Sequence, residues 1–298
     1  MGCSSEKTKD FIPENNKEFP VSRLSIPITD EIDSMIAFDS KNIILGAKDE
    51  LKIVNLNTSE ISTISKDIKK RINCIIKLPD GKIVTGGQDA NLKVWDINKK
   101  ECLYSLSGHT SIIWDLKLAS NDKLISASDD NTSKIWNLNS KTSEFLYKGR
   151  RHISSIAVLK NNKVLLAAGK NVLLFNLDNK EQESCLISSV WSLKELKNGD
   201  VAAGLGNGLL YILSITDEIN IKTEFTRAHK TTINTIIELE NGKLVTSSAE
   251  CNLILWDINE PESFFIIKGH SDIVTSICLI EGNKFASVSR DKTLKIWE

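Results

Sequence analysis

Two stretches of this sequence carry the side chains of a hydrolytic triad, each followed by a tryptophan. The two sets share one relative spacing, and they are His109, Ser126, Asp130 and Trp136, and His270, Ser287, Asp291 and Trp297. A nucleophilic serine needs a neighbouring base, an open cleft and donors that stabilise an oxyanion. Neither serine lies in a Gly-x-Ser-x-Gly elbow, and the set occurs in two separate segments. We therefore interpret both sets as buried polar groups that satisfy one another, not as catalytic sites.

The elements that position these sets follow a repeat of about forty residues. Seven segments share the shape of "LKVWDIN", and their key positions are Val54, Trp95, Trp136, Phe175, Ile212, Trp256 and Trp297. The steps between successive positions are 41, 41, 39, 37, 44 and 41 residues. A regular period of this length indicates a repeat architecture.

Each repeat also contains two apolar runs separated by a polar turn, as in "INCIIKLPDGKIVTGG" and "INTIIELENGKLVTSS". Short runs rich in Ile, Val and Leu with Asp, Asn and Gly between them predict successive antiparallel strands. Runs such as "VLLAA" are apolar at consecutive positions, so both faces of each sheet should be buried. The sequence therefore predicts an all-β protein whose sheets pack face to face around an axis.

Two segments carry a family resemblance, "SGHTSIIWDLKLASNDKLISASDDNTSKIWNLN" and "KGHSDIVTSICLIEGNKFASVSRDKTLKIWE". With Gly-His at the front and a Trp-Asp-like pair at the end, they resemble WD repeats. The resemblance covers roughly residues 19–298 and implies a seven-bladed β-propeller with four-stranded antiparallel blades. The last repeat ends at its third strand, whereas "FPVSRLSIPI" (19–28) precedes the first repeat without a blade of its own. We expect this N-terminal strand to close the ring on the last blade.

The resemblance also assigns the His/Ser/Asp/Trp sets to a structural tetrad, a hydrogen-bonded chain that crosses one blade. A further repeat offers His229, Thr246, Glu250 and Trp256, with Glu where the family usually has Asp. His152 looks like a tetrad histidine but comes about three residues too late. We expect it on the loop entering the fourth blade, near the surface.

A propeller without a catalytic set usually serves as a platform for partners. In the family, the top face binds through residues that flank the start of each inner strand or precede the tetrad Asp. Transferred by register, the candidates are Arg71, Asn73, Gln88, Trp114, Asp129, His152, Trp191, Asn234, Thr275 and Arg290, and the nearby Arg151 is added to them. Trp and Arg often anchor interfaces, but the two tryptophans can equally pack between blades and the arginines can be solvated loop charge. Clustered guanidinium groups would suit an acidic or phosphorylated peptide.

We expect a non-enzymatic scaffold that binds proteins or peptides, a monomeric propeller within a larger complex. The four histidines are scattered and no phosphate-binding loop occurs, so no metal or cofactor is expected. One alternative is a membrane-anchored signalling adaptor similar to G-protein beta subunits, although their long N-terminal helix is missing. Another is the substrate receptor of a ubiquitin ligase, which would need a separate docking subunit.

Composition limits the classes of partner and the location. The 298 residues carry a net charge of −1, which argues against nucleic acid held through phosphate contacts. The six cysteines lie far apart, and the five after Cys3 are expected to be small buried hydrophobes. The start lacks the apolar core of a secretory signal, so we expect a cytoplasmic protein.

The first 18 residues, beginning "MGCSSEKTKD", are expected to be a disordered tail outside the propeller. Gly2 is the acceptor that myristoylation requires, and Cys3 could take a palmitoyl group as the second chain of a stable anchor. The myristoylation pattern expects Ser or Thr where this chain has Glu6. Two readings stay open, a lipid anchor at the cytosolic face of a membrane and a leader without function.

Overall fold

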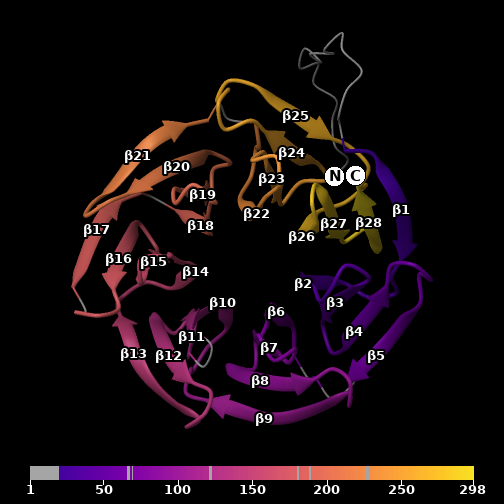
Figure 1. Ribbon diagram of the computed structural model, residues 1–298, viewed down its shortest axis with the longest axis horizontal. Coiled ribbons are helices and arrows are strands. Elements are labelled where there is room, and N and C mark those ends of the chain that lie inside the picture. The colour runs from indigo at the N-terminus through magenta and orange to yellow at the C-terminus, as the bar shows by residue number, and fades with distance from the viewer. Residues whose placement is uncertain are drawn as a thin grey trace.

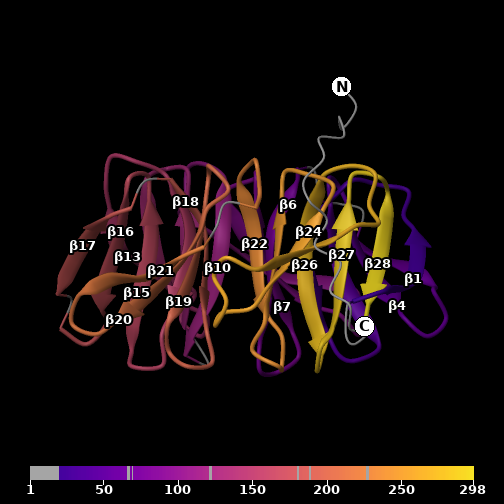
Figure 2. The same cartoon turned by 90° about the horizontal axis from the view of Figure 1, so that it is seen from above.

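Strands account for all the regular secondary structure in the described part of the chain. The computed structural model describes residues 20–298 except 66, 67, 69, 121, 122, 180, 188, 226 and 227. These residues form 28 strands in seven four-stranded antiparallel sheets, arranged as blades around a central axis (Figure 1). Figure 2 shows the same ring edge-on as a flat disc, with the strands running between its two faces. The predicted all-β, seven-bladed propeller is confirmed.

Every blade is built from strands that are consecutive in the chain, except the last, which takes its outer strand from the N-terminus. From the inside outward, blades 1 to 3 are β2 (Ile32–Ala37), β3 (Asn42–Ala47), β4 (Leu51–Asn55), β5 (Ile61–Ser65); β6 (Ile72–Lys77), β7 (Ile83–Gly87), β8 (Asn91–Asp96), β9 (Glu101–Ser107); and β10 (Ile113–Ser120), β11 (Lys123–Ser128), β12 (Thr132–Asn137), β13 (Thr142–Lys148). Blades 4 and 5 are β14 (Ile153–Val158), β15 (Lys163–Ala168), β16 (Asn171–Asn176), β17 (Gln182–Leu186); and β18 (Val190–Glu195), β19 (Val201–Leu205), β20 (Leu210–Ile215), β21 (Ile219–Glu224). Blades 6 and 7 are β22 (Ile233–Glu238), β23 (Leu244–Ser248), β24 (Leu253–Trp256), β25 (Phe264–Ile267); and β26 (Val274–Glu281), β27 (Lys284–Ser289), β28 (Thr293–Trp297), β1 (Ser22–Pro27).

The hydrophobic core lies between the blades, as the consecutive apolar runs predict. Seven buried clusters occupy the seven junctions between neighbouring sheets. Trp136 packs towards blade 2 and Trp297 towards blade 6, so these two tryptophans each fill the junction with the preceding blade. Because both faces of a sheet are covered, the strands need no alternation of apolar and polar residues.

The ring closes through the N-terminal strand. β1 pairs antiparallel with β28, from Ser22 opposite Trp297 to Pro27 opposite Thr293. The backbone of Val21 extends the ladder by exchanging hydrogen bonds of 3.0 and 3.3 Å with Glu298. Ile26 is only 2% exposed, in the cluster between blades 7 and 1. The predicted closure is confirmed, and pairing covers the edge of β28 that would otherwise be free.

Expectations for the cysteines and the leader have different outcomes. Cys74 and Cys278 are buried as expected. The expectation is wrong for the other three, because Cys185 and Cys251 are only half-buried and Cys102 is exposed on the outer strand β9. Gly2 and Cys3 lie outside the described residues. Among the described residues, no helix is long and apolar enough to cross a membrane.

Candidate functional site

The tetrad of blade 3 is a continuous hydrogen-bonded chain. The Trp136 indole donates to the Ser126 hydroxyl oxygen over 2.7 Å, and that oxygen lies 2.6 Å from His109 Nε2. His109 Nδ1 lies 2.7 Å from an Asp130 carboxylate oxygen. An ionised carboxylate only accepts, so Nδ1 carries the proton and the Ser126 hydroxyl donates to Nε2. Ser126 is 0% exposed and therefore not presented to a substrate.

Burial and hydrogen bonding set the pKa values in this tetrad. Burial lowers the pKa of His109 below its usual value, and Asp130 only partly opposes this. Burial would raise the pKa of Asp130, but hydrogen bonds from Thr132, Thr110 and His109 outweigh it and hold that pKa low. The pair is a neutral imidazole on a carboxylate, and it fixes the turn between β11 and β12 to the start of the blade.

Blade 7 repeats this geometry, whereas blade 6 breaks it. His270 lies 2.8 Å from an Asp291 oxygen and 2.6 Å from the Ser287 hydroxyl. In blade 6, His229 Nε2 still lies 2.8 Å from the Thr246 hydroxyl, but its Nδ1 is buried without a hydrogen-bond partner. Glu250 instead accepts from the backbone N–H of Thr231 at 2.9 Å. The longer Glu250 side chain therefore accepts the backbone hydrogen bond that the usual Asp would accept, but it does not bind the imidazole.

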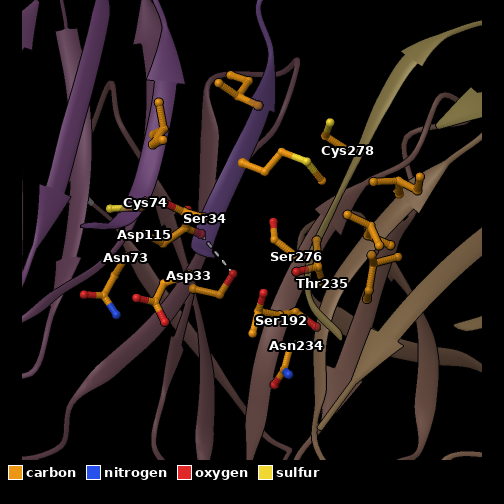
Figure 3. Close-up of a pocket in the computed structure, with 18 of the residues that line it drawn as sticks. Asp33, Ser34, Asn73, Cys74, Asp115, Ser192, Asn234, Thr235, Ser276 and Cys278 are labelled. Atoms are coloured by element: carbon orange, nitrogen blue, oxygen red, sulfur yellow. Dashed lines mark hydrogen bonds between the residues drawn. The ribbon is translucent and has the colours of Figure 1, made fainter. Parts of the chain in front are cut away.

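A β-bulge at the start of every inner strand shapes the central channel. In all seven strands the pairing register shifts at the second residue. Bulges re-aim side chains, and these second residues form a ring that we call the channel mouth. They are Asp33, Asn73, Trp114, Ser154, Trp191, Asn234 and Thr275, and all line a cavity of about 680 Å³ along the axis. Figure 3 shows Asp33 and Asn73 on one wall of this cavity and Asn234 on another.

The structure brings six of the eleven residues predicted to bind partners to this cavity. They are Asn73, Trp114, Trp191, Asn234, Thr275 and Arg290. The other five do not line it, and they are Arg71, Gln88, Asp129, Arg151 and His152. Three of these five still contact lining residues, as the next paragraphs describe.

The two candidate tryptophans differ in how they are held. The Trp114 indole donates to Asp129 over 2.8 Å, so both side chains are engaged within blade 3. Trp191 is 37% exposed, and its ring centroid lies 5.6 Å from that of His152. His152 is half-buried immediately before β14, where the late spacing of the sequence places it. Of the two, Trp191 offers an apolar face to solvent.

Arg71 is not a free guanidinium. Its two terminal nitrogens donate over 2.7 Å each to Glu31 and Asp33 of blade 1. Burial raises the pKa of the Asp33 carboxyl, and Arg71 only partly offsets this. One oxygen of Asp33 and the amide oxygen of Asn73 are buried without a partner.

Glu31 and Asp33 were not among the residues predicted from the sequence, because the register was not applied to blade 1. Asp33 nevertheless occupies the same position after the first apolar residue as Asn73 does in blade 2. Applying that count to blade 1 would have found Asp33.

Small polar residues near the channel mouth join neighbouring blades, and this gives Thr275 a structural role. Hydroxyls donate to the carbonyl oxygen of the first residue in the next inner strand: Ser34 to Ile72 at 2.8 Å, Ser154 to Val190 at 2.8 Å, Ser192 to Ile233 at 2.9 Å and Thr275 to Ile32 at 2.6 Å. We call these four contacts the blade latches. Gly204 faces one of them, and a Cβ there would lie 2.4 Å from the Ser192 hydroxyl oxygen.

Comparison with known proteins agrees with this geometry. The fold is similar to the crystal structure of the WD40 β-propeller domain of Doa1, with a TM-score of 0.82 and 16% identity, covering 94% of this chain and 97% of that one. Residues 59–96, 100–137 and 261–298 match the sequence model of WD40, described as WD domain, G-beta repeat. The chain is a WD-repeat β-propeller. Each of the three matched segments ends one residue after the tryptophan of its blade, which is Trp95, Trp136 or Trp297.

Two curated relatives match most of this WD-repeat propeller. The Denticleless protein homolog of Gallus gallus is 21% identical over 307 residues, covering 81% of this chain and 42% of the relative. Cell division control protein 4 of Saccharomyces cerevisiae is 27% identical over 240 residues, covering 80% of this chain and 29% of the relative. The chain spans less than half the length of these relatives.

Proposed function

We propose that this WD-repeat propeller is a non-enzymatic scaffold that binds other proteins through the channel mouth. The observation that carries the proposal is Trp191, an indole 37% exposed beside an axial cavity of about 680 Å³. Exposed aromatic side chains at the rim of a concave site are typical anchors of protein interfaces. WD-repeat propellers generally bind other proteins, which supports the same class of function.

The tetrads favour a scaffold over a hydrolase. Ser126 and Ser287 are each 0% exposed and each accepts from a tryptophan indole. A buried hydroxyl engaged by both an indole and an imidazole has neither the cleft nor the oxyanion donors that a nucleophile requires. The residues that resemble a triad therefore support the blades.

Affinity purification from the native cell tests the scaffold. Proteins captured by the wild type are compared with those captured by Trp191→Ala and by Phe145→Ala. Phe145 is the matched control, because it is 54% exposed on the outer strand β13, away from the cavity. We expect Trp191→Ala to lose partners that Phe145→Ala retains. If all three proteins captured the same partners equally, the channel mouth would not be the binding site.

The same experiment separates the two alternatives for the setting of the scaffold. A signalling adaptor would be captured with membrane signalling proteins, whereas a ubiquitin-ligase receptor would be captured with a docking subunit and ligase components. Neither alternative changes the role proposed for the channel mouth. The two alternatives differ in the proteins with which the propeller is assembled.

A lipid anchor through Gly2 and Cys3 is a separate part of the proposal. It rests on the residue types, since myristoylation needs Gly2 and a second chain on Cys3 would make binding stable. Metabolic labelling with an alkyne myristate should mark the wild type and not Gly2→Ala. An alkyne palmitate should mark the wild type and not Cys3→Ser. A wild type without either label would end this part of the proposal, and a cytoplasmic location without an anchor would remain.

A further inference from the structure

The channel mouth is divided into two halves of opposite hydrogen-bonding character. Blades 1 and 2 contribute acceptors, namely the oxygens of Asp33 and Asn73 that are buried without a partner. Glu31 and Asp33 also concentrate negative charge there, although Arg71 pairs with both carboxylates and the charge of Arg290, across the junction with blade 7, offsets a further part of it without a hydrogen bond. This half disfavours a further anion.

Blades 5, 6 and 7 contribute donors. Trp191, Asn234 and Arg290 line the cavity from three consecutive blades and are all exposed. Among the described residues, the Trp191 indole N–H, the Asn234 amide and the Arg290 guanidinium make no hydrogen bond, although the Arg290 backbone N–H donates to Ile273 over 2.9 Å. We call these three residues the donor arc. Its side-chain donors face solvent and can therefore donate hydrogen bonds to a ligand.

We infer that the donor arc binds an anionic oxygen group, a carboxylate or a phosphate, on a peptide segment of a protein partner. This rests on the proposed function and names the chemistry of its ligand. A guanidinium matches a carboxylate or phosphate with two parallel hydrogen bonds. A carboxylate has about four lone-pair positions, so the Asn234 amide and the Trp191 indole can fill those that Arg290 leaves open.

The two halves also orient the segment. The anionic group lies on blades 5 to 7, while a donor of the same segment faces Asp33 and Asn73, whose unpaired oxygens favour an N–H or O–H group. The Trp191 ring, backed by His152, covers the apolar stem that carries the anion. Among the arginines expected to attract acidic peptides, the structure thus selects Arg290 over Arg71, which is already bound to two carboxylates.

A display library of random twelve-residue peptides, selected on the full-length protein, tests the inference. Peptides that need Trp191 are identified first, by their loss on Trp191→Ala. We expect these peptides to be enriched in Asp, Glu or a free C-terminal carboxylate. For a selected peptide, Arg290→Gln and Glu→Gln in the peptide should each weaken binding by about tenfold or more, because a hydrogen-bonded ion pair is removed. The two changes together should cost little more than either alone.

Arg150→Gln is the matched control. Arg150 is an exposed arginine that does not line the cavity, so its exchange removes the same charge from a position outside the channel mouth. It should change affinity by no more than about twofold, as expected of screened charges without a direct contact. Thermal unfolding confirms that both variants are folded. An equal loss for Arg150→Gln and Arg290→Gln would reduce the effect to general electrostatics and overturn the inference.

The remaining outcomes each decide a separate point. Replacing the peptide glutamate by phosphoserine distinguishes the two sources of anionic oxygen, and tighter binding that still needs Arg290 supports a phosphorylated partner. Peptides that need Trp191 but are basic or neutral, and indifferent to Arg290→Gln, would overturn the inference and leave the scaffold in place. A library in which no binding depends on Trp191 would overturn the proposed use of the channel mouth as well.

Discussion

The Thr275 hydroxyl donates a hydrogen bond of 2.6 Å to the carbonyl oxygen of Ile32, 243 residues earlier in the chain. This contact is the latch between blade 7 and blade 1, the junction at which the two ends of the chain meet. The other three latches join blades that are consecutive in sequence. Closure therefore combines a side-chain latch at the channel mouth with the pairing of β1 and β28 at the rim.

Removing the closing latch should lower stability. Thr275→Val keeps the shape of the side chain and deletes its hydroxyl, so the Ile32 carbonyl loses its donor. We expect the free energy of unfolding to fall by about 1 kcal/mol, the typical net contribution of one hydrogen bond. Denaturant unfolding measures this. Thr235→Val, next to the corresponding position in blade 6, is the control, because among the described residues its hydroxyl makes no hydrogen bond. An equal loss of unfolding free energy in the two variants would mean that the Thr275 latch does not contribute to ring closure.

Removing the N-terminal strand should have a larger effect. Deleting residues 1–26 removes most of β1, including Ile26, which is 2% exposed. Burial of one such side chain contributes about 1.5–3 kcal/mol, and the ladder to β28 is lost with it. We expect a marked fall in the melting temperature, whereas deletion of residues 1–15 should leave it unchanged. Equal melting temperatures for the two truncations would contradict closure by β1.

The contribution of the tetrad Asp–His contact to stability can be tested by giving blade 7 the glutamate that blade 6 has at the Asp position. Asp291→Glu should leave His270 Nδ1 without its acceptor, as Glu250 leaves His229. The expected loss of unfolding free energy is about 1–3 kcal/mol, the cost of a buried group left unpaired. Asp217→Glu makes the same chemical change at a fully exposed position and should be neutral. A stable Asp291→Glu variant would show that the His–Asp contact contributes nothing.

Acid should destabilise the propeller through these buried histidines. Burial lowers the pKa of His229 from 6.5 to about 4. Between these two pH values His229 is protonated in the unfolded chain and neutral in the folded chain, so acid favours unfolding. Stability should fall as the pH drops from about 6.5 to about 4, by roughly 3 kcal/mol from this residue alone at 1.36 kcal/mol per pKa unit. His109 and His270 shift in the same direction. Urea unfolding at pH 7.5 and 5.0 measures the change, and a flat profile would contradict it.

The sequence predicts most of the fold because each blade repeats one local solution. The spacing of residues such as Trp95, Trp136 and Trp297 identifies the blades, and the unmatched strand at 19–28 identifies the closure. These features depend on burial and pairing that recur in every repeat. Blades 4 and 5, which lack the tetrad, are held by strand pairing, by the apolar cluster between them and by the latches of Ser154 and Ser192.

The channel mouth could be predicted only in part. Register places Asn73, Trp191 and Asn234 at the cavity, because a bulge recurs at the same point of every inner strand. The same register cannot tell whether a small hydroxyl such as that of Thr275 faces a ligand or the next blade. That choice depends on the distance between blades, as does the pairing of Arg71 with Glu31 across a junction. Non-local geometry of this kind leaves no periodic signal.

The central claim is that proteins bind at the channel mouth through Trp191. Its most direct test is the affinity of a purified partner, captured from the native cell, for the wild type, Trp191→Ala and Phe145→Ala, measured by calorimetry beside the melting temperature of each protein. We predict at least about a tenfold loss of affinity for Trp191→Ala, as expected of an anchor residue at an interface, together with an unchanged affinity for Phe145→Ala and closely similar melting temperatures. A partner that binds Trp191→Ala as tightly as the wild type would contradict it.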